Sequence, residues 1–284
     1  MEVSTGVSHQ HSRRATVMTE YTAPPGAPVW FDLMSSDTAK AIDFYGDLFG
    51  WKVEEPNPDF GGYQNFTLNG HRIAGLMPVM GEGAVPNVWS SYLRSDDPEA
   101  TLELVTAAGG SVMLPPMDVG DEGTMAVAVD SAGAVIGFWK PNKHKGFAEW
   151  GVHGAPYWFE CVSQDYTKSV VFYPEVVGAR VETVIDNSAV EIVEPGNPLR
   201  YSQVFFGDMS YAGIMDAANL FPPELPSFWQ IYICVDDVPA TVKRAEEIGG
   251  SVMMPATDTP YGTLATVHDP NGALISLGHP PAGM

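Results

Sequence analysis

Two acidic residues in apolar segments of this chain have the setting of a proton donor or acceptor. Asp32 lies in the segment PVWFDLMSSD and Glu160 in APYWFECVSQD, and each follows a tryptophan, Trp30 or Trp158, by two residues. A carboxylate half-buried against an indole ring loses hydration, which raises its pKa toward neutral pH. Asp32 and Glu160 are therefore candidate general acids and bases. The alternative is that each pairs with a nearby Arg, Tyr or backbone N–H, or faces solvent.

Four tryptophans recur at matching places, each seven residues before an aspartate and within a strand-like segment: Trp30, Trp89, Trp158 and Trp229. We expect the first two to line one cleft and the last two another. Such a cleft suits a flat apolar ligand, because each ring buries roughly 150–250 Å². The alternative is that all four fill the core. Tyr63 and Tyr201, each on a later strand, are weaker candidates for hydroxyls that contact the ligand.

The spacing of these segments indicates an internal duplication. Trp158 lies 128 residues after Trp30, whereas Trp229 lies 140 residues after Trp89. The second copy is therefore longer, and the extra length falls in Ile185–Arg200, which is rich in turn residues.

Each copy reads as two units of one strand, one helix and three strands. The first unit has a strand at Val29–Met34 and a helix at Thr38–Phe49, with Asp37 as its N-cap and Gly50 after its last turn. The matching helix of the second copy contains Pro174, which predicts a kink, a shorter helix or a late start. We predict a disordered N-terminal tail over residues 1–26, with Met18 as an alternative start, a first domain over 27–141, a linker over 142–155 and a second domain over 156–281.

The composition excludes several classes of partner. A formal charge of −21 argues against nucleic acid or an anionic membrane, because phosphate binding needs clustered Lys and Arg. No apolar run reaches the length of a membrane span, and the first residues lack the apolar core of a signal peptide. Cys161 and Cys234 are expected to be free buried thiols that face a helix, in a cytoplasmic protein.

Three segments carry a family resemblance: AIDFYGDLFGWKVE at 41–54, DPNGALISL at 269–277 and its weaker twin DSAGAVIGF at 130–138. Together with the four strand–helix–strand units, they resemble the vicinal oxygen chelate superfamily of glyoxalases, bleomycin- and fosfomycin-resistance proteins and extradiol dioxygenases. The tandem arrangement is similar to proteins related to the mycobacterial 27 kDa antigen and to actinobacterial "hydroxylases" of antibiotic clusters. The resemblance implies an α+β fold of four βαβββ modules in two pairs, each pair forming a cup-shaped mixed β-sheet with helices outside.

Metal-dependent members of that superfamily carry His, Glu or Gln on the first strand of a module and Glu on the last. The first-strand places here match the four tryptophans, whose indole N–H cannot bind a metal, and the last-strand places match Gly137 and Ser276. A shift of one residue supplies Gln230 alone. We therefore expect no metal and no other cofactor.

The leading hypothesis is a metal-independent protein that binds, and as an enzyme modifies, a hydrophobic aromatic small molecule of the polyketide or antibiotic type. In the enzyme version Asp32 or Glu160 moves a proton while the tryptophans hold the rings. The first alternative is a resistance protein that sequesters a drug without turnover. The second is a glyoxalase- or dioxygenase-like metalloenzyme. The duplication supplies module pairing within one chain, so the protein is expected to be a monomer or a homodimer.

Overall fold

The computed structural model describes residues 21–80, 85–188 and 198–279. The expected alternative start at Met18 and most of the expected extra hairpin length lie outside the described residues. Residues 21–26, which we assigned to the N-terminal tail, are packed: Tyr21 is buried, and its hydroxyl donates to the carbonyl of Pro28 over 2.7 Å.

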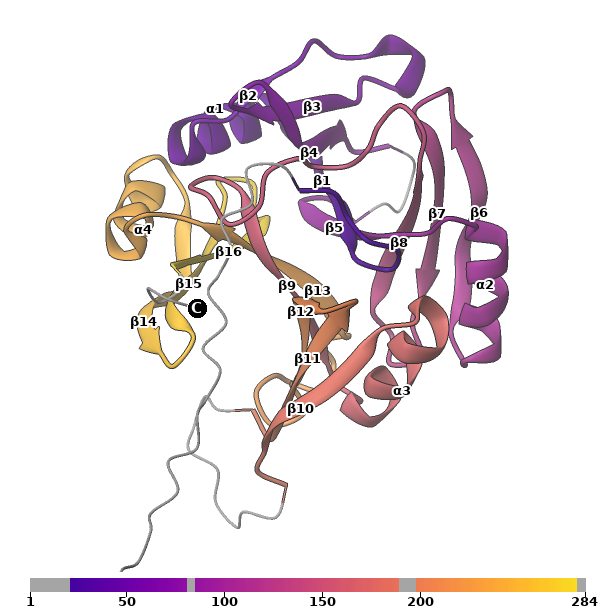
Figure 1. The fold of residues 1–284 in the computed structure, drawn as a ribbon. Coiled ribbons are helices and arrows are strands. Elements are labelled where there is room, and N and C mark those ends of the chain that lie inside the picture. The colour runs from indigo at the N-terminus through magenta and orange to yellow at the C-terminus, as the bar shows by residue number, and fades with distance from the viewer. Residues whose placement is uncertain (1–20, 81–84, 189–197, 280–284) are drawn as a thin grey trace, which may run out of the picture.

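The first half of the chain forms one eight-stranded mixed sheet with strand order β2-β3-β4-β1-β5-β8-β7-β6 (Figure 1). Its elements, in chain order, are β1 (Pro28–Ser35), α1 (Thr38–Phe49), β2 (Lys52–Val53), a 3-10 turn (Pro58–Phe60), β3 (Gln64–Leu68), β4 (His71–Pro78), β5 (Val88–Arg94), α2 (Pro98–Ala107), β6 (Ser111–Val119), β7 (Gly123–Val129) and β8 (Val135–Pro141).

The second half repeats this arrangement in a separate eight-stranded sheet of order β10-β11-β12-β9-β13-β16-β15-β14. Its elements are β9 (Pro156–Ser163), α3 (Tyr166–Val177), β10 (Arg180–Asp186), β11 (Arg200–Phe206), β12 (Met209–Asp216), β13 (Phe228–Cys234), α4 (Val238–Glu247), β14 (Ser251–Thr259), β15 (Gly262–His268) and β16 (Leu274–His279). The predicted α+β fold of four modules in two pairs is confirmed.

The helices begin and end where their capping residues predict. Asp37 accepts a hydrogen bond from the backbone N–H of Lys40 at the start of α1, and Gly50 ends the helix with a φ of 72°, which a side chain would make costly. The helix α3 has the same 12-residue length as α1 although it contains Pro174. Pro174 therefore neither shortens this helix nor delays its start.

The two halves pack through the sheet faces that also contact the helices. Phe31 of β1 lies 6.0 Å from Phe159 of β9, measured between ring centroids. The helices pair across the halves, α1 beside α4 and α2 beside α3 (Figure 1). We call this side of each sheet the helix face and the opposite side, which carries Asp32 or Glu160, the cup face. The two cup faces therefore point away from each other.

A reciprocal pair of hydrogen bonds joins the halves. The Tyr45 hydroxyl of α1 donates to Asp269 over 3.2 Å, and the Tyr173 hydroxyl of α3 donates to Asp130 over 2.7 Å. Each aspartate opens the turn before the last strand of the opposite half, in the sequences DPNGA and DSAGA. The free, buried thiol of Cys161 lies on this face, 3.9 Å from the Tyr173 hydroxyl, as predicted.

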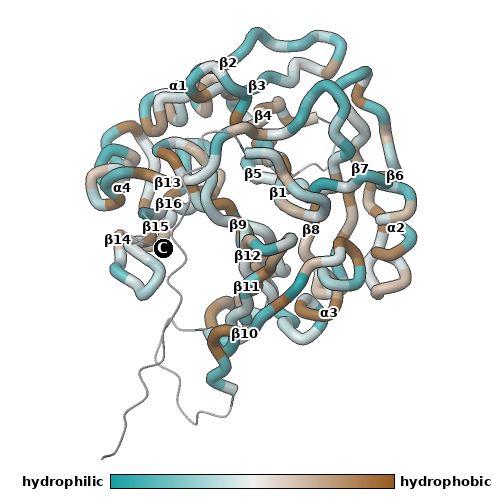
Figure 2. Tube along the Cα trace, in the orientation of Figure 1, coloured by the Kyte–Doolittle hydropathy of each residue, from teal (hydrophilic) through white to brown (hydrophobic). Residues whose placement is uncertain are grey.

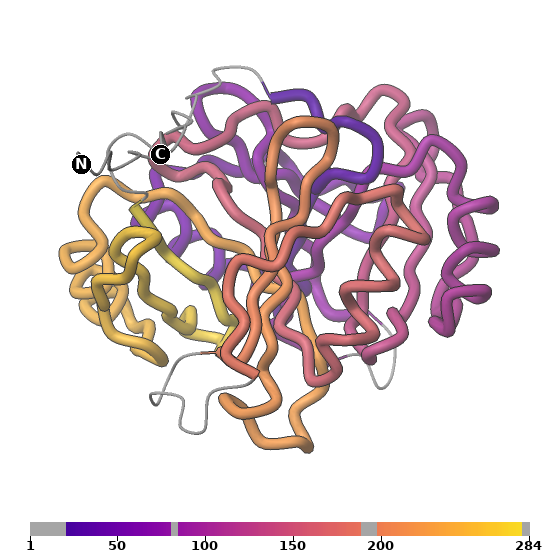
Figure 3. Tube along the Cα trace, turned by 60° about the horizontal axis from the view of Figure 1, so that its bottom comes forward, coloured from indigo at the N-terminus to yellow at the C-terminus, as the bar shows by residue number. Residues whose placement is uncertain are grey.

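The segment between the halves is not a solvated linker. Within residues 142–155, Phe147 and Trp150 are buried and stack on Tyr21 at centroid distances of 4.9 and 5.1 Å. This aromatic cluster fills the space between the two sheets. In Figure 3 the yellow C-terminal module and the magenta helix α2 lie at opposite ends of the molecule, with the centre of the chain between them.

Hydrophobic and hydrophilic residues alternate along the strands and helices, as the colouring in Figure 2 shows. No helix in the described part of the chain is long and apolar enough to cross a membrane.

Candidate functional site

In the first half, three side chains form a hydrogen-bonded chain that ends on a buried carboxylate. The indole N–H of Trp30 donates to the Tyr63 hydroxyl over 2.8 Å, and that hydroxyl donates to Asp32 Oδ2 over 3.2 Å. Trp30 and Asp32 lie on the cup face of β1, and Tyr63 lies just before β3. The Tyr92 hydroxyl, from β5, also bonds Asp32.

The second half repeats the same chain with a longer acid. The indole N–H of Trp158 donates to the Tyr201 hydroxyl over 2.9 Å, and Tyr201 hydrogen-bonds Glu160. Two further donors reach Glu160 Oε2: the Gln230 amide over 2.5 Å and the Tyr232 hydroxyl over 3.1 Å. Sequence reasoning proposed these tryptophans, tyrosines and acids separately, and the fold places them side by side.

Glycines on the neighbouring strand make room for these tyrosines. A Cβ at Gly75 of β4 would lie 1.8 Å from the Tyr63 hydroxyl oxygen, and a Cβ at Gly213 of β12 would lie 2.1 Å from that of Tyr201. Either atom would overlap the phenol. The close approach of a tyrosine to the backbone therefore explains why both positions are glycine.

Burial is the largest cause of the shifted pKa values of Asp32 and Glu160. Asp32 is 6% exposed and Glu160 is 5% exposed. Loss of hydration raises the pKa of Asp32 to about 7, although hydrogen bonds from Tyr92 and Tyr63 act in the opposite direction. Burial also raises the pKa of Glu160, against the lowering effect of its bonds from Gln230 and the two tyrosines. Both carboxyl groups are thus poised to hold a proton more strongly than an exposed acid.

The expectation that Trp89 and Trp229 line the clefts is wrong. The indole N–H of Trp89 donates to the Tyr45 hydroxyl of α1 over 3.1 Å, and that of Trp229 donates to the Tyr173 hydroxyl of α3 over 2.8 Å. Both rings lie on the helix face and pack at the contact between the halves.

The error arose from aligning the repeat on Asp96 and Asp236, each the first aspartate of a pair. Helix α2 begins after the N-cap Asp97, not after Asp96, and α4 begins after Asp237. Counting back from the true caps shifts the repeat by one residue. The cup-face partners across β1 and β9 are therefore Ser90, opposite Asp32, and Gln230, opposite Glu160.

Three further residues of the cup faces were not predicted, two because of the same shift in register and one because no spacing in the sequence links it to the others. Tyr92 and Tyr232 lie opposite Trp30 and Trp158 in the antiparallel strand pairs, two residues after the corrected positions. His144 comes from the segment after β8, and its ring lies 4.2 Å from that of Trp30. Burial lowers the pKa of His144 to about 3, so the imidazole is neutral.

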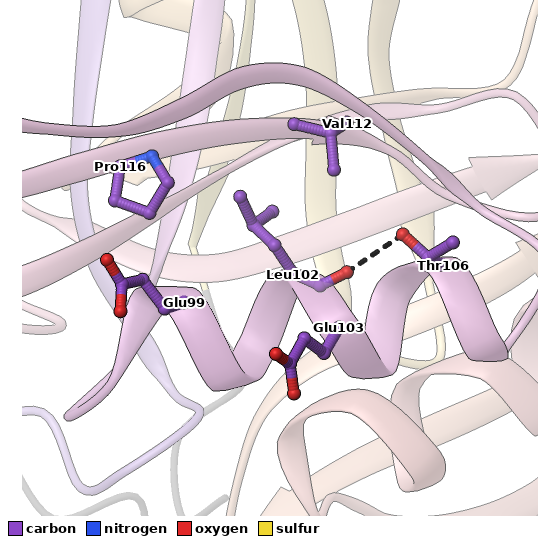
Figure 4. A pocket seen from close by; sticks show the side chains of 6 residues that line it. All are labelled: Glu99, Leu102, Glu103, Thr106, Val112 and Pro116. Carbon is purple, nitrogen blue, oxygen red and sulfur yellow. Dashed lines mark hydrogen bonds between the residues drawn. The ribbon is translucent and has the colours of Figure 1, made fainter.

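Two surface hollows lie away from these carboxylates. One, of about 440 Å³, lies between α2 and β6, where Leu102 points from the helix toward the strand that carries Val112 and Pro116 (Figure 4). The other, of about 410 Å³, lies at the contact of α1 with α4 beside Lys40, Asp43 and Asp47. Neither contains a residue of the hydrogen-bonded chains.

The family model of the glyoxalase/bleomycin resistance protein/dioxygenase superfamily matches residues 7–138 and 158–277. The chain belongs to this superfamily. The resemblance inferred from the sequence is thereby confirmed, and each sheet corresponds to one matched region.

Two named relatives are similar to this chain over most of their length. The putative glyoxylase CFP32 of Mycobacterium tuberculosis is 35% identical over 261 residues, which cover 90% of this chain and 95% of that protein. The anthracycline biosynthesis protein DnrV of Streptomyces peucetius is 34% identical over 277 residues, covering 91% and 96%. Among solved structures, a Mn(II)-bound glyoxalase from Novosphingobium aromaticivorans aligns with a TM-score of 0.61 at 16% identity, covering 90% of this chain and 83% of that one. This last likeness shows the fold alone.

The cup residues do not fit a metal of the kind such superfamily members hold. Transition metals in proteins need several imidazole, thiolate or carboxylate ligands around one point. Asp32 is bonded by tyrosine hydroxyls and Glu160 by tyrosine hydroxyls and the Gln230 amide, and no group of three His, Cys, Asp or Glu residues in the described part of the chain is placed to hold an ion. At the last-strand place of the first half, Gly137 has no side chain, and a Cβ there would lie 2.1 Å from the Tyr92 ring.

Proposed function

We propose that this chain binds a flat aromatic polyketide on a cup face and moves a proton on it with a buried carboxyl group, without a resident metal. The observation that carries the proposal is the duplicated chain of indole, phenol and carboxylate, in which burial raises the pKa of Asp32 to about 7 and raises that of Glu160. A carboxyl group with a pKa near the working pH both takes and returns a proton efficiently.

The reaction class that fits this group is keto–enol interconversion. The carboxylate takes a proton from a carbon that is conjugated with a carbonyl, either next to it or, as in an anthrone, through an aromatic ring; the C–H electron pair enters the conjugated π system of the enolate, and the negative charge moves to oxygen. The hydroxyl of Tyr201 or Tyr63 donates to the ionised carboxylate before the transfer; once the carboxyl group holds the proton, this hydroxyl turns to donate to the enolate oxygen. Return of the proton from the carboxyl group to carbon or oxygen completes the step, so atoms and charge balance without another reagent.

The class of ligand is supported by two independent features. DnrV and DauV, each at least 33% identical to this chain, are anthracycline biosynthesis proteins. The rings of Trp158 and Tyr201 are partly exposed on the cup face around Glu160, and indole and phenol surfaces favour contact with other aromatic rings. A polycyclic ketone with hydroxyl groups matches both the rings and the hydrogen-bonding groups.

A second function uses the same surface without turnover. Glu160 Oε2 already accepts bonds from Gln230 and Tyr232 before any ligand binds, which favours a carboxylate held in place over one that exchanges protons. In that case the cup holds a drug-like ring system and the carboxylate only orients it.

An anthrone is a suitable probe, because it is a flat tricyclic ketone whose methylene protons exchange through its enol tautomer. Binding is followed by quenching of tryptophan fluorescence, and catalysis by deuterium incorporation from heavy water, measured by mass spectrometry without oxygen. We expect saturable binding and an exchange rate above that of buffer. Asp32→Asn and Glu160→Gln are compared with Asp43→Asn, which removes an exposed carboxylate of α1.

Loss of exchange in Asp32→Asn or Glu160→Gln, with binding retained, supports proton transfer. Binding without accelerated exchange in the wild type supports sequestration and refutes the enzyme. Stoichiometric Mn²⁺, Ni²⁺ or Zn²⁺ in the purified protein, with exchange lost on chelation, refutes the metal-independent mechanism.

A further inference from the structure

The two cup faces differ in what covers them. In the first half the chain after β8 turns back over the cup. The backbone N–H of His144 donates to the carbonyl of Glu122 over 3.0 Å, and the indole N–H of Trp139 donates to the carbonyl of His144 over 3.0 Å. The His144 ring then stands edge-on against Trp30, which is only 4% exposed. The segment 142–147 therefore closes the first cup.

One substitution between the repeats changes the side chain at the corresponding place in the second half. Trp139 of β8 lies two residues after Gly137, which pairs with Tyr92, and Gly278 of β16 lies two residues after Ser276, which pairs with Tyr232. The second half thus has glycine where the first has tryptophan.

Tyr157 occupies the space above this glycine. A Cβ at Gly278 would lie 1.8 Å from the Tyr157 hydroxyl oxygen, so only glycine admits the ring there. Tyr157 is partly exposed and meets Tyr232 edge-on at a centroid distance of 6.1 Å. Among the described residues, the second cup has a partly exposed phenol at the place where the first cup has a buried indole under segment 142–147.

The turns at the tips of the outer hairpins also differ between the two halves. The turn between β6 and β7 carries Asp121, which forms an ion pair with Lys143 of the covering segment. The shorter turn between β14 and β15 carries Tyr261, which is 39% exposed and stacks on Tyr201 at 6.1 Å and 29°. The first turn holds the cover in place, whereas the second extends the aromatic surface next to Glu160.

We propose that the second cup is the ligand-binding site, that Tyr157 and Tyr261 are contact residues that select a flat ring system, and that the first cup is a closed copy with a structural role. This assignment rests on the proposed function and refines it. The ligand lies between Tyr261, Tyr157 and Trp158, with its oxygen substituents toward the Gln230 amide and Glu160. The Asp32 chain then stabilises the first half rather than acting on the ligand.

The assignment is tested with anthrone as the probe and two matched variants at equivalent hairpin tips, Tyr261→Ala and Asp121→Ala. Both side chains are exposed at turns, so both variants are expected to fold, which thermal melting checks. Loss of one stacking partner is expected to raise the Kd about 10-fold in Tyr261→Ala. Asp121→Ala is expected to bind within about 2-fold of the wild type, since a surface ion pair has little energetic weight.

Hydrogen–deuterium exchange with and without anthrone gives a second readout. Protection is expected in peptides from β9, β13 and the turn at residues 259–262. Protection confined to β1, β5 and residues 142–147, or an unchanged Kd in Tyr261→Ala, would overturn the assignment to the second cup while leaving the proposed function intact. Absence of any anthrone binding to the wild-type chain would overturn both.

Discussion

The raised pKa of Asp32 predicts a specific pH dependence of stability. Its folded-state pKa of about 7 lies above the ordinary value of 3.8, because burial disfavours the charged form. The folded chain therefore binds this proton more tightly than the unfolded chain. The resulting stabilisation is fully present below pH 3.8 and is lost as the pH rises through 7. Asp32→Asn removes this dependence and keeps an oxygen that accepts from Tyr63 and Tyr92.

The size of the effect follows from the shift. About three pKa units at 1.36 kcal/mol each correspond to roughly 4 kcal/mol between the acidic and alkaline limits. Linkage places about 2–3 kcal/mol of this between pH 5 and pH 8. Relative to the wild type, the free energy of unfolding of Asp32→Asn is therefore expected to rise by that amount over this range.

Urea unfolding at half-unit steps from pH 5 to pH 8 measures the difference, with Asp43→Asn as a control that removes an exposed carboxylate. The comparison with the wild type cancels the contributions of Glu160, Asp130 and Asp269, whose pKa values burial also raises. If the curves of wild type and Asp32→Asn run parallel within about 0.5 kcal/mol, the Asp32 carboxyl is not held protonated by burial and the reasoning fails.

Three further outcomes are expected. Arg200→Met removes the ion pair of 2.8 Å between Arg200 and Asp216, whose side chain is 2% exposed. The free energy of unfolding in urea should fall by about 2–4 kcal/mol, because the buried carboxylate loses its partner. A fall of under about 0.5 kcal/mol would show that the partly exposed arginine is dispensable. Tyr173→Phe removes the hydroxyl that bonds Asp130 across the halves, with an expected loss of about 1–3 kcal/mol, and an unchanged melting temperature would contradict that role. The anthrone exchange rate should fall as the pH drops through the raised pKa of Glu160, and Glu160→Gln should abolish the pH-dependent part; a pH-independent wild-type rate would argue against this base.

The boundaries of the helix α1 could be predicted from the residues at its two ends. Asp37 and Gly50 bracket α1 at the predicted residues, because a cap hydrogen bond and a left-handed φ are decided by neighbours in the chain. The two copies of the module could likewise be recognised from the spacing of their tryptophans. The repeat was aligned on Asp96, whereas the residue equivalent to the N-cap Asp37 is Asp97, and this displaced the strand register by one residue.

That displacement had a large effect because side chains alternate between the two faces of a strand. It moved Trp89 and Trp229 onto the cup face in the prediction, and it placed Tyr92 and Tyr232 on the wrong face. Pairing with β1 and β9 resolves the register, since Leu33 lies opposite Trp89 and Glu160 opposite Gln230.

The sequence alone determined the superfamily, the four modules and the two acids that follow Trp30 and Trp158, because these depend on short motifs and regular spacing. Only the tertiary structure decided what surrounds those acids. Tyr63 reaches Asp32 from 31 residues away, and Gln230 reaches Glu160 from 70 residues away. Such contacts form because sheet pairing brings distant strands together, and their burial, which sets the pKa of each acid, exists only once both sheets are complete.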